Sequence, residues 1–217
     1  MTIKVLLADD HAVVRDGLRY VLEAQGDIVV VGEAGDGRQA VSNSQRLRPD
    51  VVVMDLGMPE LNGIEATRQI HETCGSVQVV ILSVHATSEY IFRALEAGAK
   101  GYLLKESAGP ELVEAVRAVH RGRRYLGRKI SEAGIEEYVH RRQARRARSP
   151  LESLSPRERE VLQLVVEGKS SVEIGETLSL SSKSVDTYRS RIMGKLSIKN
   201  LPELVKFAIL HGITPLR

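Results

Sequence analysis

Short apolar runs bounded by polar turns recur through the first half of the chain, and each run is typical of a buried parallel strand. They span residues 3–8, 28–32, 51–55, 77–83 and 101–105. Amphipathic helix patterns follow them, at about 12–24, 37–47, 63–72, 88–97 and 109–121. This alternation predicts an α/β domain built on a doubly wound five-stranded parallel sheet.

The pattern changes after His120. Residues 121–150 contain no strand pattern and no strong apolar face, so we expect a basic linker over 122–149 between domains at 1–121 and 150–217. The last part is helical by pattern, with helices expected at about 156–167, 171–178, 182–196 and 201–211. Ser155-Pro-Arg-Glu158 has the form of a capping box, and Ser181 can cap the third helix. The tight turn before that helix predicts a helix-turn-helix within an all-α four-helix domain.

Composition narrows the class of protein. A chain of 217 residues suits one large or two small domains. Its single cysteine, Cys74, cannot form an internal disulfide, which favours a reducing cytoplasm over a redox role for that thiol. No apolar stretch approaches the roughly 20 residues of a membrane span. The N-terminus runs directly into a strand pattern, so we expect no secretory signal and no membrane partner.

The charge is divided unevenly along the chain. Residues 1–120 hold 11 Lys and Arg against 17 Asp and Glu, a net charge of −6, whereas residues 121–217 hold 20 against 11, a net charge of +9; together they give +3. A basic rear domain favours a nucleic-acid partner. The linker carries five arginines within 141–148. This run is either a solvated helix face or an arm that touches phosphates or the acidic first domain.

Five polar residues fall at the carboxyl ends of the predicted strands. They are Asp9, Asp10, Asp55, Ser83 and Lys105. In an open α/β sheet, these ends meet at the edge where ligands bind. A carboxylate there can attack a phosphoryl donor and form an acyl phosphate, provided that the site supplies positive charge and hydrogen-bond donors.

Mg²⁺ (or Mn²⁺) is the natural source of that charge, because it prefers carboxylate oxygens and keeps several waters. We expect Asp10, Asp55 and the backbone carbonyl of Gly57 to be direct ligands, with Asp9 acting through water. Lys105 would pair with one phosphoryl oxygen and the Ser83 hydroxyl would bond another.

Other interpretations account for less of this pattern. Any single aspartate at a strand end usually caps the next helix, but that explanation would have to hold for the whole set. A haloacid-dehalogenase-type phosphatase needs a second aspartate where the chain has Gly57. Neither an enclosed substrate pocket nor a second acid/base is visible for a phosphotransferase acting on metabolites, so we expect no enzyme. The histidines show no paired spacing typical of a zinc site.

Four segments resemble the receiver domain of two-component response regulators: Ala8-Asp-Asp10, Met54-Asp55-Leu-Gly-Met-Pro59, Ile81-Leu-Ser83 and Gly101-Tyr102-Leu-Leu-Lys105. The resemblance covers residues 3–121 and implies a flavodoxin/CheY-like fold. It implies that Asp55 is the phosphoacceptor and that Ser83 and Tyr102 form a switch pair. Two positions depart from common receivers, since Glu106 stands where many have proline and Gly57 offers no side chain to shield the phosphoryl group.

The rear half is similar to the LuxR-type helix-turn-helix, through Leu154–Leu162, Gly168–Ile174, Leu180–Tyr188 and Lys195–Ile198. Together with the receiver, the chain resembles the NarL/FixJ family of response regulators. The resemblance implies DNA contacts on the third helix: Lys183, Ser184, Asp186, Thr187, Tyr188, Ser190, Arg191 and Lys195. Asp186, Thr187 and Ser190 would face bases, and the basic side chains and Tyr188 would hold phosphates. Ser171 and Val172 replace an Asn-Lys pair often found in this family.

The expected protein is a cytoplasmic transcription factor. A sensor histidine kinase would phosphorylate Asp55, and the phosphorylated chain would form homodimers on promoter DNA, with RNA polymerase as a further partner. The acidic receiver would cover the basic recognition helix before phosphorylation. The main alternative is a constitutive DNA-binding regulator whose receiver is only a dimerisation scaffold. A third hypothesis is that the rear half is a generic four-helix bundle that binds another protein.

Overall fold

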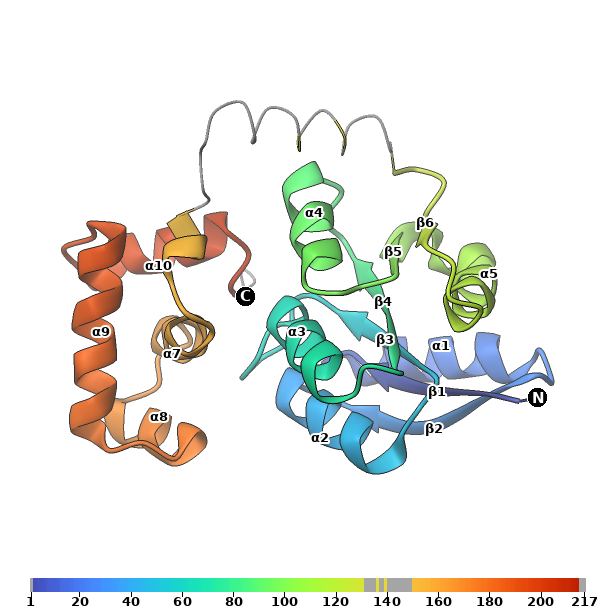
Figure 1. Cartoon of the computed structure of the whole chain (residues 1–217), viewed down its shortest axis with the longest axis horizontal. Helices are drawn as coiled ribbons and strands as arrows, with labels where there is room; N and C mark the ends of the chain where they lie inside the picture. Colours follow the sequence, from blue (N-terminus) through green and yellow to red (C-terminus); the bar gives the residue numbers. More distant parts are fainter. Residues whose placement is uncertain (1, 131–135, 137–138, 140–149, 215–217) are drawn as a thin grey trace. The chain divides into compact units, whose positions relative to one another are not determined.

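A computed structural model describes residues 2–130, 136, 139 and 150–214. The chain divides into two compact units, residues 1–141 and 142–217 (Figure 1). No helix within the described ranges is long and apolar enough to cross a membrane. The arginine run at 141–148, predicted to lie in the linker, falls outside the described residues.

The first unit is a parallel sheet in the order β2-β1-β3-β4-β5-β6. Its strands are β1 (Ile3–Ala8), β2 (Ile28–Ala34), β3 (Val51–Asp55), β4 (Gln78–Ser83), β5 (Gly101–Leu104) and β6 (Tyr125–Leu126). The order reverses at β1, as in a doubly wound sheet. The α/β class is therefore confirmed.

The count of five strands was wrong. β6 lies in the segment where no strand was predicted, and it pairs in parallel with β5 through Gly101 and Tyr125. Two residues among arginines are too short a run to show a strand pattern. The apolar side chain of Ile130, a few residues later, is buried in the same unit. The sheet therefore continues past residue 121.

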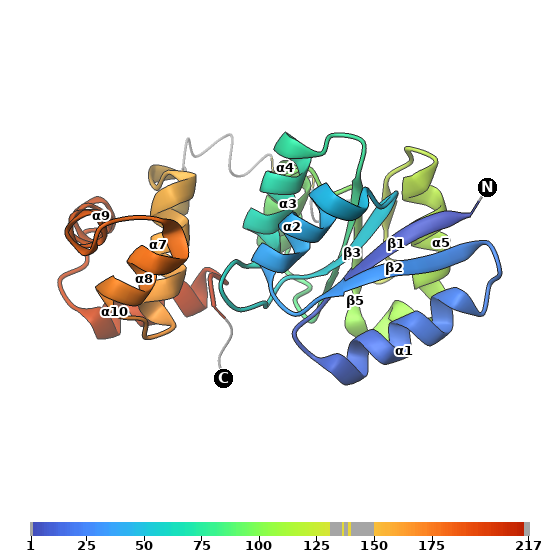
Figure 2. The ribbon, with the colours of Figure 1, turned by 90° about the horizontal axis from the view of Figure 1, so that it is seen from below.

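Helices cover both faces of this sheet (Figure 2). They are α1 (Ala12–Glu23), α2 (Gly37–Leu47), α3 (Gly63–Thr73), α4 (Ser88–Glu96) and α5 (Ala108–His120), with a 3₁₀ turn, η1 (Lys105–Ser107), before α5. Each lies within one residue of its predicted bounds. Helices α1 and α5 cover one face, and α2, α3 and α4 cover the other.

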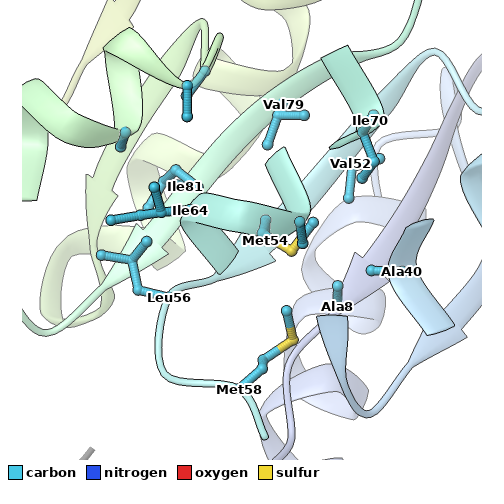
Figure 3. Close-up of a cluster of buried hydrophobic side chains, with 14 of the residues drawn as sticks. Ala8, Ala40, Val52, Met54, Leu56, Met58, Ile64, Ile70, Val79 and Ile81 are labelled. Carbon is cyan, nitrogen blue, oxygen red and sulfur yellow. The ribbon is translucent and has the colours of Figure 1, made fainter. Parts of the chain in front are cut away.

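Alternate residues of each strand enter opposite cores, as the two-residue period of a strand requires. Val51 and Val53 of β3 pack with α1 and α5, whereas Val52 and Met54 pack with α2, α3 and α4. Figure 3 shows part of the second cluster, in which Val52 and Met54 lie among side chains of the neighbouring strands and of α3. With both faces buried, the strand ends become the place where polar side chains emerge.

The loop after Asp55 is held by tight packing. The side chains of Leu56, Met58 and Leu61 are buried beneath it (Figure 3 labels the first two). Asn62 then caps α3 by accepting hydrogen bonds from the backbone N–H groups of the first turn. A Cβ at Gly63 would stand only 2.0 Å from the carbonyl oxygen of Asp55. This close approach fixes the direction in which the chain leaves Asp55.

The second unit is all-helical around its own core. It contains η2 (Pro150–Ser153), α7 (Pro156–Val166), α8 (Ser171–Leu178), α9 (Ser182–Leu196) and α10 (Leu201–Leu210). The predicted capping box at Ser155 and the cap at Ser181 are both confirmed.

The turn between α8 and α9 is tight. Ser179 adopts a left-handed conformation with φ of 54°, and the N–H of Leu180 donates to the carbonyl of Gly175 at 2.8 Å. A Cβ at Gly175 would lie 2.6 Å from the Leu180 carbonyl oxygen. The two helices therefore form a helix-turn-helix, as predicted.

We predict that Gly63→Ala destabilises the first unit by about 1–3 kcal/mol, because the new methyl group must displace backbone at Asp55. Urea unfolding followed by circular dichroism measures the change. Gly17→Ala is the matched control, since a Cβ there meets nothing within 4 Å on α1 and should stabilise the helix by about 0.5–1 kcal/mol. Equal effects of the two variants would contradict the packing argument.

Candidate functional site

The predicted polar residues do meet at one edge of the sheet. Asp9 follows β1, Asp55 and Ser83 end β3 and β4, and Lys105 follows β5. Because β1, β3, β4 and β5 are consecutive neighbours in a parallel sheet, their carboxyl ends lie side by side. Asp9, Asp55 and Ser83 are buried, and Lys105 is partly exposed.

Lys105 joins two of the carboxylates. Its Nζ lies 2.7 Å from Asp9 Oδ2 and 3.1 Å from Asp55 Oδ1. An ammonium between two buried carboxylates offsets part of their mutual repulsion and of the cost of burying them. It also occupies the position from which a cation could contact an oxygen of a group bound to Asp55.

The environment changes the ionisation of these groups. Burial raises the pKa of Asp55 to about 6, with Lys105 opposing the shift and Asp9 adding to it. Burial alone would lower the pKa of Lys105, but the charges of Asp55 and Asp9 raise it above its usual value. Lys105 is therefore charged at neutral pH. Added positive charge at the site would favour the ionised, nucleophilic form of Asp55.

Asp9 and Asp10 form the acidic part of the site together with His11, which the sequence had not marked. Ligand atoms of the three residues all lie within 4.8 Å of one another. His11 Nδ1 is 3.2 Å from Asp9 Oδ1 and 2.7 Å from Asp10 Oδ1. The backbone N–H of His11 also donates to Asp9 Oδ1 at 2.9 Å. In the sequence, only the position of His11 beside Asp9 and Asp10 indicated that it belongs to this cluster.

The donor set of this edge fits a hard divalent cation. Asp9 and Asp10 present carboxylate oxygens, and Lys105 links Asp9 to the Asp55 carboxylate. Mg²⁺ binds such oxygens and retains water in its remaining positions. The backbone carbonyl of Gly57 remains a predicted ligand.

The predicted switch residues are joined through His85. The His85 N–H donates to Ser83 Oγ at 3.0 Å, and the Tyr102 hydroxyl donates to the His85 carbonyl at 2.7 Å. The His85 ring stacks on Tyr90 of α4, with ring centroids 4.4 Å apart. The ring of Tyr102 is fully buried, and burial raises the pKa of its phenol, so it remains a neutral donor. A change at Ser83 is thereby connected to β5 and to α4.

The predicted DNA-contact residues all lie on α9. Its buried side, with Val185 and Ile192, packs on the core. Five of the predicted residues are exposed on the helix near Asp186: Lys183, Asp186, Thr187, Ser190 and Arg191. Lys195 is also exposed, whereas Ser184 and Tyr188 are partly buried.

Two of these side chains contact side chains of other helices in the domain, which the sequence pattern could not show. Lys195 Nζ lies 2.6 Å from Glu158 Oε2, the carboxylate of the capping box of α7. Asp186 Oδ1 accepts a hydrogen bond of 2.7 Å from Ser171 Oγ. The first contact joins α9 to α7, and the second joins α9 to the preceding helix, α8.

Comparisons with known proteins agree with this geometry. The model of the response regulator receiver domain matches residues 5–117, and that of the bacterial regulatory proteins of the luxR family matches residues 152–208. The oxygen regulatory protein NreC of Staphylococcus carnosus is 40% identical over 209 residues, covering 95% of this chain and 96% of NreC. The response regulator UvrY of Escherichia coli is 40% identical over 211 residues, covering 97% and 95%.

The chain is also similar to a solved complex of the response regulator RcsB with DNA, at a TM-score of 0.56 and 27% identity, covering 99% of this chain and all of that one. A receiver sheet with its acidic edge, followed by a helix-turn-helix, defines a two-component response regulator with a LuxR-type DNA-binding domain. The chain belongs to the NarL/FixJ family of these transcription regulators.

We predict a pH-dependent effect of Asp55→Asn on stability in the absence of metal. The folded pKa of about 6 exceeds the unfolded value of about 3.9. The stability contributed by this carboxyl is therefore fully present below about pH 4 and is lost as the pH rises through about 6. Asp55→Asn should be more stable than the wild type by about 1–3 kcal/mol at pH 8, and the difference should vanish near pH 4.

Urea unfolding with a chelator present, at several pH values between 4 and 8, measures this difference. Asp16→Asn removes a carboxylate from the exposed face of α1 and serves as the control, with a difference that stays nearly constant. A constant difference for Asp55→Asn as well would contradict the burial argument.

Proposed function

We propose that phosphorylation of Asp55 controls dimerisation and sequence-specific DNA binding by this response regulator. The observation that carries the proposal is the position of Lys105, within 3.1 Å of the Asp55 carboxylate and 2.7 Å of the Asp9 carboxylate. A nucleophile, a cation and an acidic pair at one sheet edge are the parts that aspartyl phosphorylation requires.

In the proposed reaction, an oxygen of the ionised Asp55 carboxylate attacks the phosphorus of a phosphohistidine on a sensor histidine kinase. The new oxygen–phosphorus bond forms as the phosphorus–nitrogen bond breaks, and the imidazole leaves with the bonding electron pair. Asp10, Asp55 and the backbone carbonyl of Gly57 would hold Mg²⁺ or Mn²⁺ directly, with Asp9 acting through water. The ion would supply charge stabilisation for the phosphoryl oxygens. Lys105 then pairs with one of these oxygens and Ser83 Oγ donates to another.

The hydrogen bonds around Ser83 support the transmission of a change at Asp55 to the surface around α4. A phosphoryl group of about −2 charge on Asp55 would draw the Ser83 hydroxyl toward it. The His85 backbone bonds both Ser83 and Tyr102, and its ring stacks on Tyr90, so such a shift would reach the surface around α4. We propose that this surface changes its affinity for a second copy of the chain.

The proposed output is binding of homodimers to promoter DNA in the cytoplasm, with RNA polymerase as the subsequent partner. Helix α9 would enter the major groove with its first turns at the base edges. Lys183 and Arg191 are exposed cations that suit phosphate contacts. Thr187 and Ser190 are exposed and suit base contacts, since hydroxyls can serve either kind of base. The match of RcsB, solved with DNA, to the whole chain supports this output.

The second candidate function is constitutive DNA binding with the receiver as a dimerisation scaffold. The complete constellation of Asp9, Asp55 and Lys105 favours the phosphorylated switch, because a scaffold has no need of a charged catalytic edge.

We predict that the wild type, given Mg²⁺ and acetyl phosphate, becomes more dimeric and binds a genomic DNA pool at least about tenfold more tightly, whereas Asp55→Asn does neither. A tenfold change needs only about 1.4 kcal/mol of coupling between phosphorylation and binding. Analytical ultracentrifugation and fluorescence anisotropy are the measurements. Equal DNA affinity with and without phosphoryl donor, in both proteins, would support the constitutive alternative instead.

A further inference from the structure

Asp186 does not stand alone on the exposed face of α9. Its Oδ1 accepts a hydrogen bond of 2.7 Å from the hydroxyl of Ser171, the first residue of α8. The same hydroxyl accepts a longer bond of 3.4 Å from Nη1 of Arg189, nearly one turn further along α9. Ser171 therefore links α8 to two side chains of α9, the helix proposed to contact DNA bases.

The direction of these bonds follows from the chemistry of the groups. A guanidinium can only donate, and an ionised carboxylate can only accept. The Ser171 hydroxyl has a single proton, so it must give that proton to Asp186 and accept from Arg189. Arg189 therefore donates to Ser171, and Ser171 donates to Asp186. These two bonds hold the Asp186 carboxylate in a defined orientation.

Only Oδ1 of Asp186 is engaged in this way. Oδ2 makes no hydrogen bond within the part of the chain that the structure describes, and the residue is exposed. A carboxylate oxygen held in the major groove can accept a hydrogen bond from the amino group of cytosine. Arg189 brings positive charge next to this carboxylate, which reduces its repulsion by the DNA phosphates.

We propose that Ser171 is a positioning residue for base recognition, which holds Asp186 so that its free oxygen discriminates a cytosine amino group at one base pair. The inference rests on the proposed DNA binding by α9.

The competing explanation is that the hydrogen bond between Ser171 and Asp186 only stabilises the packing of α8 against α9. Loss of a purely stabilising bond would weaken binding to all DNA sequences alike and lower the stability of the domain. Loss of a positioning contact would change the preference at one base pair. The two explanations therefore differ in the pattern of base preference and not only in affinity.

The experiment is selection of bound duplexes from a randomised pool by the full-length chain, treated with acetyl phosphate and Mg²⁺, followed by sequencing. Asp186→Ala first identifies the base pair whose preference depends on the carboxylate. Ser171→Ala should then lower the preference at that same base pair by about threefold or more, since a well-placed base contact gives roughly tenfold discrimination. Ser171→Thr keeps the hydroxyl and should restore the preference.

Three further variants serve as controls. Thr177→Ala removes a hydroxyl from the same helix that bonds only its own backbone, at Glu173, and should leave all preferences unchanged. Lys183→Ala should weaken binding to all sequences and reduce the salt slope by about one. Thr187→Ala should change the preference at a different base pair.

An unchanged preference in Ser171→Ala, or a uniform loss of affinity with a lower melting temperature, would overturn the inference without contradicting the proposed DNA-binding function. A wild type that selects no sequence at all would overturn the proposed function, and the inference with it. A loss confined to the base pair that depends on Asp186, restored by Ser171→Thr, would establish it.

Discussion

The contact of Lys105 with two buried carboxylates is the interaction on which the site depends. Asp9 and Asp55 end neighbouring strands, so a parallel sheet brings two negative charges together in a place with little water. Without a cation this arrangement would be strongly unfavourable. Lys105, at the end of β5, bridges both carboxylates, yet Asp55 keeps a pKa of about 6. The formal charges of Asp9, Asp10, Asp55 and Lys105 sum to −2, and this negative charge favours a divalent cation.

The backbone that follows Asp55 is closely packed. The Gly63 backbone approaches the Asp55 carbonyl where no side chain would fit, and buried leucine and methionine side chains hold the loop between them. The rest of the edge is joined by hydrogen bonds through the backbone of His85. In the proposed function, Ser83 is the part of the site that responds to a charge on Asp55, through its hydrogen bond with the backbone of His85.

The sequence predicted most of the fold because its signals were local and strong. The short apolar runs ending at Asp55 and Ser83 are typical of buried strands, and Ser155 and Ser181 marked helix starts through their caps. The strand at Tyr125 was missed because two residues among arginines carry no periodicity. His11, Ser171 and Glu158 were missed as partners for a different reason. Their contacts depend on the three-dimensional placement of side chains, which spacing along the chain does not encode.

The two domains differ in how their polar residues are used. In the receiver, charged groups are buried and paired, so that a small chemical change has a large electrostatic effect. In the helix-turn-helix, they stand on the surface, and internal partners such as Glu158 orient them. The proposed function requires that phosphorylation in the first domain controls DNA binding by the second. Asp55 must therefore be the nucleophile.

Reductive trapping tests this claim most directly. The full chain is incubated with acetyl phosphate and Mg²⁺, treated with borohydride to convert any acyl phosphate to the alcohol, digested and analysed by mass spectrometry. Conversion is expected at Asp55 alone, and it should be lost with a chelator and strongly reduced in Lys105→Met. Absence of conversion, or conversion at Asp9 or Asp10 instead, would contradict this claim.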